Sequence, residues 1–302
     1  MNDVSYTIEQ TDLMKAVRES AMLADVSISM WNAEKTDRDA TEELKKQHGA
    51  SGNIGRVVKN MLAGADAKLK EVRSAFSAVR TAHYNLTLPW VANPHAERQS
   101  GPRLLPTLLF QQYTGALSKG RWEAMNILDV FIEAYPNLIE RARQNLGTLA
   151  DTFYPTAENV KSQFRISFDF EPIPAGESFK GLPDHAIERL AAALQAKQQR
   201  MVGAATAAMW SEVKERVGHV VEKLADPEAR FKSSTIANVR ELITLLPGWD
   251  LANSSEGREV VQDIDNMLTG VDAKVLRDDL TTRSATAAKA QAVMEKLQRW
   301  GV

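Results

Sequence analysis

The chain contains no cysteine among its 302 residues. This absence excludes disulfides, thiolate zinc sites and cysteine nucleophiles, and it is typical of proteins kept in a reducing cytoplasm. Long hydrophobic runs are missing too, because no apolar stretch approaches the roughly 20 residues that span a bilayer. The first residues are polar and acidic, unlike a signal peptide. We therefore expect a cytoplasmic protein without membrane contact.

Motifs for catalysis and for cofactor binding are also missing. The sequence has no HExxH pair and no GxSxG or SxxK nucleophile. Its nearest approach to a phosphate loop, residues 49–56, lacks the Lys-Ser or Lys-Thr that would follow, so we interpret it as a capping loop. The five histidines have no ligand spacing, and acidic pairs such as Asp263 and Asp265 lie in charged helices. The sequence predicts a protein that is not an enzyme and that uses neither metal nor cofactor.

An excess of one charge is absent from the chain as a whole, since its formal net charge is −2. Within residues 53–103, however, eight basic residues stand against three acidic ones. A local basic surface can bind phosphate even on a nearly neutral molecule. The predicted nucleic-acid-binding residues are Arg56, Lys59, Lys68, Lys70, Arg73, Arg80, Arg98 and Arg103. The alternative is a solvated helix face packed near the acidic N-terminal part of the chain.

Aromatic residues make up only 7% of the chain, yet several lie close to these basic residues in the sequence. Tyr84, Trp90, Tyr113 and Trp122 are candidates for stacking on bases, as in sequence-tolerant binding of single strands. The same residues would also serve to fill a core where helices cross short strands. Both interpretations stay open at this point.

Helical spacing of apolar residues dominates the chain. It predicts helices over residues 8–24, 37–48, 53–84, 107–134 with a continuation from 136, 184–224, 234–246, 255–268 and 281–300. The helix at 184–224 would be about 60 Å long and is rich in alanine, which favours close packing along another helix or in a coiled-coil arm. Thr156, Ser233 and Ser254 are the predicted helix caps. Residues 93–106, rich in proline, glycine and charge, are the clearest predicted loop.

One segment, residues 164–171, has the alternation of a half-buried strand instead. A lone strand cannot satisfy its own backbone N–H and C=O groups, so it must pair. The runs at 26–31 and 86–90 are possible partners within the chain, and a second copy of the strand is the alternative. The predicted self-association residues are Phe164, Ile166, Phe168 and Phe170.

Together these patterns predict a mainly α fold: an elongated long-helix hairpin or bundle with a small antiparallel β element. We expect a helical body over residues 1–250 that contains the hairpin and the β element. A C-terminal helical segment is expected over residues 251–302.

Several short sequences carry a resemblance when they are taken together. They are residues 23–32 (LADVSISMWN), 104–106 (LLP), 154–155 (YP), 164–170 (FRISFDF) and 172–174 (PIP). In these segments the chain resembles a family of phage and prophage proteins of similar length, which is classed as a domain of unknown function. The resemblance covers most of the chain and is weakest after residue 255.

The resemblance implies a partner rather than a reaction. Members of that family tend to be encoded near a MoxR- or cobaltochelatase-like AAA+ ATPase and a von Willebrand A-type protein. This implies a phage-encoded protein in the cytoplasm of a bacterial host, acting as an adaptor or substrate of such an ATPase or in phage DNA metabolism. The family offers no catalytic residues to transfer.

We therefore expect a non-catalytic, homo-oligomeric binding or assembly protein whose basic segment contacts single- or double-stranded DNA. The alternative is a protein-interaction factor without nucleic-acid binding, such as a phage structural component or an inhibitor of a host defence enzyme. Charge reversal at Lys68, Lys70 and Arg73 would leave such a factor active. A third class, an enzyme with an unfamiliar site, requires converging acidic or histidine residues in a deep pocket.

Overall fold

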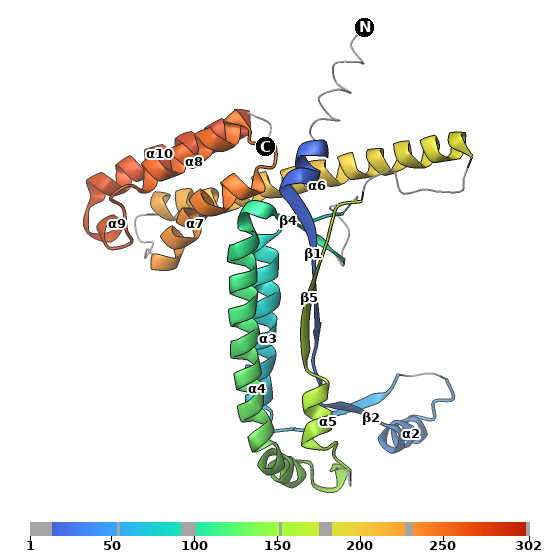
Figure 1. Cartoon of the computed structure of the whole chain (residues 1–302). Helices are drawn as coiled ribbons and strands as arrows, with labels where there is room; N and C mark the ends of the chain where they lie inside the picture. Colours follow the sequence, from blue (N-terminus) through green and yellow to red (C-terminus); the bar gives the residue numbers. More distant parts are fainter. Residues whose placement is uncertain are drawn as a thin grey trace. The chain divides into compact units, whose positions relative to one another are not determined.

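The computed structural model describes residues 14–52, 55–91, 101–150, 153–174, 183–226 and 232–299. It is mostly helical, with long helices and small antiparallel sheets (Figure 1), which confirms the predicted fold class. The helices are α2 (Arg38–Gln47), α3 (Ala67–Leu86), α4 (Phe110–Leu146), α5 (Ala157–Ser162), α6 (Asp184–Ala225), α7 (Ser233–Trp249), α8 (Ser255–Leu268), α9 (Val275–Asp278) and α10 (Leu280–Arg299). The strands are β1 (Ala21–Ser29), β2 (Glu34–Asp37), β3 (Val57–Asn60), β4 (Arg103–Pro106) and β5 (Arg165–Glu171).

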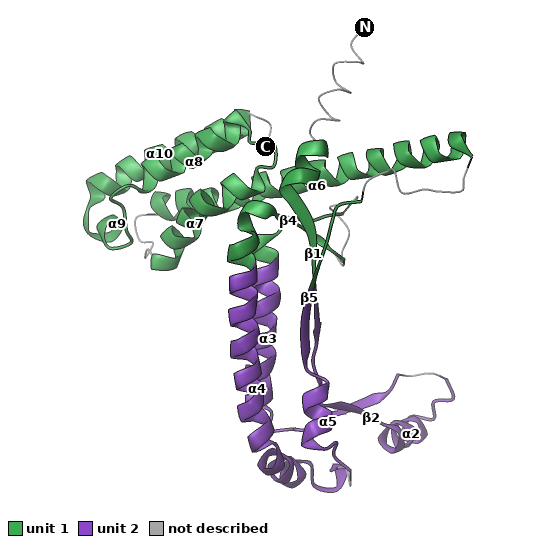
Figure 2. Ribbon diagram, viewed as in Figure 1, with its two compact units in different colours: residues 1–25, 84–113, 169–302 green, residues 26–83, 114–168 purple. Residues whose placement is uncertain are grey.

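The chain divides into two compact units, shown in separate colours in Figure 2. Unit 1 comprises residues 1–25, 84–113 and 169–302, and unit 2 comprises residues 26–83 and 114–168. The division passes within β1, β5, α3 and α4. Each unit is therefore assembled from segments that are distant in the sequence.

Unit 1 combines one end of the larger sheet with a helical bundle. The first residues of β1 pair antiparallel with β4, from Ala21 opposite Pro106 to Ala24 opposite Arg103. In the bundle, α6 packs against α7 and α10, and α8 packs against both of these helices. The second half of α6 is buried on the face that includes Val213, Val217 and Val220. The predicted helix at 184–224 is thus confirmed, and it has two helical neighbours.

Unit 2 contains a hairpin of α3 and α4, which run in opposite directions side by side (Figure 1). Close packing of the two helices depends on Gly120, because a Cβ there would lie 3.1 Å from the Val79 side chain. Aromatic rings fill the core: Phe76 packs edge-to-face on Phe164 with ring centroids 5.4 Å apart. The long helices of unit 2 therefore form a hairpin with an aromatic core.

Local capping follows the sequence closely at two of the three predicted positions. The hydroxyl of Thr156 accepts a hydrogen bond from the Asn159 N–H at the start of α5, and that of Ser254 accepts one from Gly257 N–H at the start of α8. These bonds satisfy amide groups that a helix leaves unpaired in its first turn. The third prediction was wrong, because Lys232 rather than Ser233 occupies the cap position of α7.

Three element predictions are corrected by the structure. The helix expected over 53–84 begins only at Ala67. The residues before it form β3, which pairs with β2 in a separate two-stranded sheet. Gly64, at φ +70°, then turns the chain between β3 and α3. The helix expected over 8–24 ends at residue 20, where β1 begins. Part of the expected loop at 93–106 is strand β4, whose residues are all buried.

The predicted pairing of the β segment inside the chain is confirmed. The three-stranded sheet has the order β4-β1-β5, so β5 pairs with the strand that contains most of the run at 26–31. The other candidate run, 86–90, contributes only an isolated bridge between Leu88 and Leu104. Within the described residues, β5 is a terminal strand of this sheet.

Candidate functional site

The four predicted self-association residues on β5 and just before it have different surroundings. Phe164 and Ile166 are 5% and 4% exposed, so they belong to the core of the chain. Phe170 is 37% exposed and its ring contacts Phe110 and Tyr113, with centroids 5.3 and 5.9 Å away. The apolar face of β5 is therefore buried toward its beginning and partly accessible toward its end.

The opposite face of β5 is charged and exposed. Arg165, Asp169 and Glu171 all lie at the surface, with Ser167 between them partly covered. Charged residues on a terminal strand limit indiscriminate pairing with other chains. They also determine which strand can pair, because opposite charges placed across from each other stabilise a β pair.

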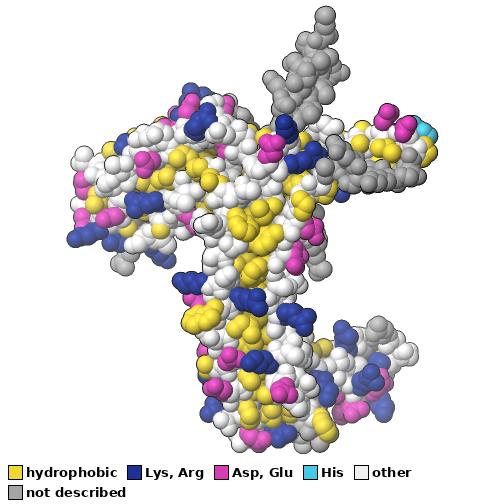
Figure 3. Space-filling model, in the orientation of Figure 1, with side chains coloured by type: hydrophobic (Ala, Val, Ile, Leu, Met, Phe, Trp, Pro, Cys, Tyr) yellow, Lys and Arg dark blue, Asp and Glu magenta, His cyan; other side chains and the backbone are white. Residues whose placement is uncertain are grey.

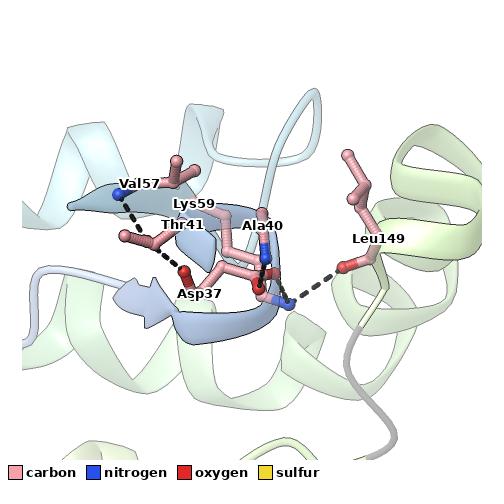
Figure 4. A network of polar contacts seen from close by, with 6 residues as sticks. All are labelled: Asp37, Ala40, Thr41, Val57, Lys59 and Leu149. Carbon is pink, nitrogen blue, oxygen red and sulfur yellow. Dashed lines mark hydrogen bonds and ion pairs between the residues drawn. The ribbon is translucent and has the colours of Figure 1, made fainter. Parts of the chain in front are cut away.

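Lys59, predicted to contact nucleic acid, is instead part of a polar network in unit 2 (Figure 4). Its ammonium group lies 3.0 Å from a carboxylate oxygen of Asp37 and donates a hydrogen bond to the Leu149 carbonyl at 3.1 Å. The Ala40 N–H also donates to Asp37, and these contacts lower the pKa of the carboxyl group. Only 15% of the Lys59 side chain is exposed, so its charge holds β3 against the start of α2.

Arg103, the last predicted phosphate ligand, is buried in unit 1 and only 8% exposed. Its guanidinium donates to the hydroxyl of Thr87 at 2.7 Å and to the Thr87 carbonyl at 2.9 Å, and it lies over the Tyr84 ring. Burial lowers the pKa of this guanidinium. Arg103 therefore fixes β4 against the segment after α3, and a phosphate has no access to it in this arrangement.

The side chains of the remaining predicted basic residues make fewer contacts with the rest of the protein. Lys70 forms an ion pair with Asp66 but is largely exposed, and Arg73 donates to the Trp31 carbonyl. Arg56, Lys68 and Arg80 have no hydrogen-bond or ion-pair partner among the described residues, and Arg98 lies outside them. On the face drawn in Figure 3, coloured Lys and Arg side chains are interspersed with acidic and hydrophobic ones.

The aromatic residues considered for base stacking are divided between core and surface. Tyr113 is completely buried, which raises the pKa of its hydroxyl, and Trp90 is 7% exposed. Trp122 on α4 is exposed over 67% of its surface. Of Trp90 and Trp122, only Trp122 is therefore accessible to a partner. The interpretation as core residues holds for Tyr113 and Trp90.

A cavity in unit 1 was missed by sequence reasoning. It has a volume of about 390 Å³ and lies between the middle of α6, the end of α7 and the start of α8. Trp210 and Trp249 both line it, together with Asp250 and Glu256. These residues are brought together only by the helix packing, so no local spacing marks them. The nearest sequence signal is the Trp-Asp pair just before the capped helix at Ser254.

A second hollow in unit 1, about 280 Å³ in volume, is lined by polar side chains that include His219 and Glu215. Its centre is an ion network: Arg216 contacts Glu212 at 2.6 Å and Glu241 at 3.0 Å, which ties α6 to α7. Among the residues that the structure describes, no group of three or more acidic or histidine side chains could hold a metal ion. This hollow is explained by the packing of α6 on α7.

Comparison of the chain with protein-family models, with curated proteins and with solved structures found no match. In the described part of the chain, none of the helices combines the length and the hydropathy needed to cross a membrane.

Proposed function

We propose that the chain is a non-catalytic assembly protein that forms a homo-oligomer through strand β5. The observation that carries this proposal is the place of β5 at the end of the β4-β1-β5 order, with no further strand beyond it among the described residues. A terminal strand offers backbone N–H and C=O groups to a strand of another chain. The partner that the side chains of β5 fit best is a second β5.

The sequence of β5 is complementary to itself when two copies run antiparallel about Phe168. In that register Arg165 lies opposite Glu171 of the second copy, and Ile166 lies opposite Phe170. Two-fold symmetry repeats each of these pairs, so one interface contains two pairs of opposite charge and two apolar pairs. Each cross-strand pair of this kind contributes about 0.2–1 kcal/mol relative to alanine.

We expect Arg165→Glu to weaken the dimer about tenfold, because it places like charges opposite each other twice per interface. The double variant Arg165→Glu, Glu171→Arg should restore dimerisation, since it exchanges the two charges without losing either pair. Light scattering over a range of protein concentrations measures the effect, and circular dichroism confirms that each variant is folded. A wild-type chain that stays monomeric throughout, or a single variant that dimerises as well as the wild type, would contradict the proposal.

A second candidate function is nucleic-acid binding by unit 2, supported by the accessible charges of Arg56, Lys68 and Arg80. Binding to DNA should then weaken with salt, with a slope of about −2 to −3 in log affinity against log salt concentration for three phosphate contacts. The Lys68→Glu, Arg80→Glu variant should reduce the affinity for both single- and double-stranded DNA. Arg103→Lys is no suitable test because Arg103 is buried.

Fluorescence anisotropy of labelled DNA at low salt decides between the two classes. If neither single- nor double-stranded DNA binds there, the DNA proposal fails, because phosphate contacts are strongest at low salt. The partner would then be a protein, and an AAA+ ATPase, to which the resemblance to phage proteins points, is the first to examine by co-purification.

A further inference from the structure

The cavity of unit 1 has the composition of a small-molecule site rather than of a packing defect. Its volume of about 390 Å³ falls within the usual range of ligand pockets, roughly 300–1,000 Å³. Apolar side chains, among them Met209 and Trp210 on α6, form much of its wall. Ordinary packing defects are small and apolar, whereas this cavity also has several polar groups at one end.

The charged groups at that end have a single sign. Asp250 and Glu256 both line the cavity, and none of its described lining residues is basic. Arg258, the nearest basic residue in the sequence, donates to the side-chain oxygen of Asn253 at 2.8 Å. Two acidic residues and no basic one line the wall, so it favours a positively charged ligand, although Arg258 lies close enough to Glu256 to help lower the pKa of its carboxyl group.

Asp250 is held in place by the start of α8. Its Oδ2 accepts hydrogen bonds from the Ser254 N–H at 2.7 Å and from the Ser254 hydroxyl at 2.8 Å. Gly257 allows this approach, because a Cβ at that position would collide with Oδ2. A carboxylate has about four acceptor positions, so these two bonds leave capacity on Asp250 for a ligand.

Glu256 supplies a second, accessible negative charge. Hydrogen bonds from its own N–H and from the Ser255 hydroxyl lower the pKa of its carboxyl group, so it is ionised at neutral pH. Its side chain lies in the first turn of α8, where a negative charge is stabilised by the helix dipole.

Trp249 contributes its indole ring to the cavity wall. The residue is 4% exposed, and its indole Nε1 is closed to solvent and has no hydrogen-bond partner among the described residues. Because that atom is buried within the packing, the ring rather than the N–H is the part of Trp249 that a ligand can contact. The second indole, Trp210, lines the same cavity, and indole faces attract cations more strongly than other aromatic rings.

We propose that this cavity binds a small organic cation: an amine on an apolar or aromatic body. The ammonium group lies near Asp250 and Glu256, and the body packs among Met209 and the two indoles. This site is independent of β5 and of the basic residues of unit 2.

Isothermal titration calorimetry of the full chain with tyramine tests the proposal. Tyramine combines a primary ammonium, an aromatic body and a hydroxyl. Tyrosol has the same skeleton with a neutral hydroxyl in place of the ammonium, and it should bind about tenfold more weakly or worse because it lacks the charge. Saturable binding of tyramine at one site per chain is the expected result.

Variants locate the binding. Glu256→Gln should weaken tyramine about threefold by removing one exposed charge, and Trp210→Leu should weaken it about tenfold by removing an aromatic ring that attracts the cation. Glu222→Gln is the matched control, because Glu222 is an exposed residue of α6 about 18 Å along the helix from Trp210. Circular dichroism verifies that each variant is folded.

Three results would overturn the proposal. They are the absence of saturable heat with tyramine, equal affinities for tyramine and tyrosol, or a loss of affinity in Glu222→Gln as large as that in Glu256→Gln. The first would show that the cavity takes no organic amine, and the second that charge has no part in binding. The third would place the binding site elsewhere.

Discussion

Replacing Phe76 with alanine is expected to lower the local free energy of unfolding of unit 2 by about 3–5 kcal/mol. Phe76 is completely buried on α3, and its ring packs edge-to-face on Phe164. Phe164 in turn faces Phe131 on α4, with centroids 6.4 Å apart. Removing the Phe76 ring leaves a hole among three elements, and a buried hole adds its own cost to the lost burial of the ring.

Amide hydrogen exchange of α3 and α4 measures this effect in the unit where the change lies. Phe153→Ala is the matched control, because Phe153 belongs to the same unit and is 83% exposed. It makes the same chemical change at the surface and should alter protection by less than about 0.5 kcal/mol. Equal effects of the two substitutions would show that Phe76 is not part of the core.

Replacing Arg283 with methionine should lower the local free energy of unfolding of unit 1 by about 2–3 kcal/mol. Arg283 on α10 is 8% exposed, and its guanidinium donates to backbone carbonyls of Lys223, Leu224 and Asp226 at the end of α6. The last carbonyls of a helix have no partner within it, and a cation there also complements the helix dipole. Methionine keeps the apolar stem but removes every donor.

Hydrogen exchange at the end of α6 reports the loss, and Arg283→Lys should give a smaller one because it keeps the charge without the planar fork. Arg189→Met, at an exposed position of the same helix, is the control and should change protection by less than about 0.5 kcal/mol. A loss of protection confined to α10, with α6 unaffected, would contradict the capping role of Arg283.

The long helices and two caps could be predicted because their determinants are local. The helix at 184–224 is encoded by uninterrupted spacing, and Thr156 and Ser254 act on amides only three residues away. The pairing of β2 with β3 could not be predicted, because the apolar residues of β3 also fit a helical period. Its partner strand, Glu34–Asp37, is almost entirely charged and gives no strand signal. Pairing across this distance is decided by the fold.

The candidate sites could also be predicted only in part, because they depend on contacts between residues that are distant in the sequence. A charge count identifies Lys59 and Arg103 as basic, but it does not reveal that Asp37 and Thr87 already bind them. The proline, glycine and charge of residues 93–106 predict a loop, and the fully buried strand β4 has no alternation that would indicate a strand there. The cavity residues Trp210 and Trp249 come from different helices, so their proximity exists only after α6 and α7 have packed.

The division of the chain has a consequence for its synthesis. Unit 2 is complete once residue 168 has been made. Unit 1 is complete only when residues 169–302 have joined residues 1–25 and 84–113. A chain growing from the ribosome can therefore finish the second unit first, while the earliest part of the first unit still lacks its helical bundle. Neither unit corresponds to a single contiguous fragment, so no one continuous piece of the gene encodes either unit alone.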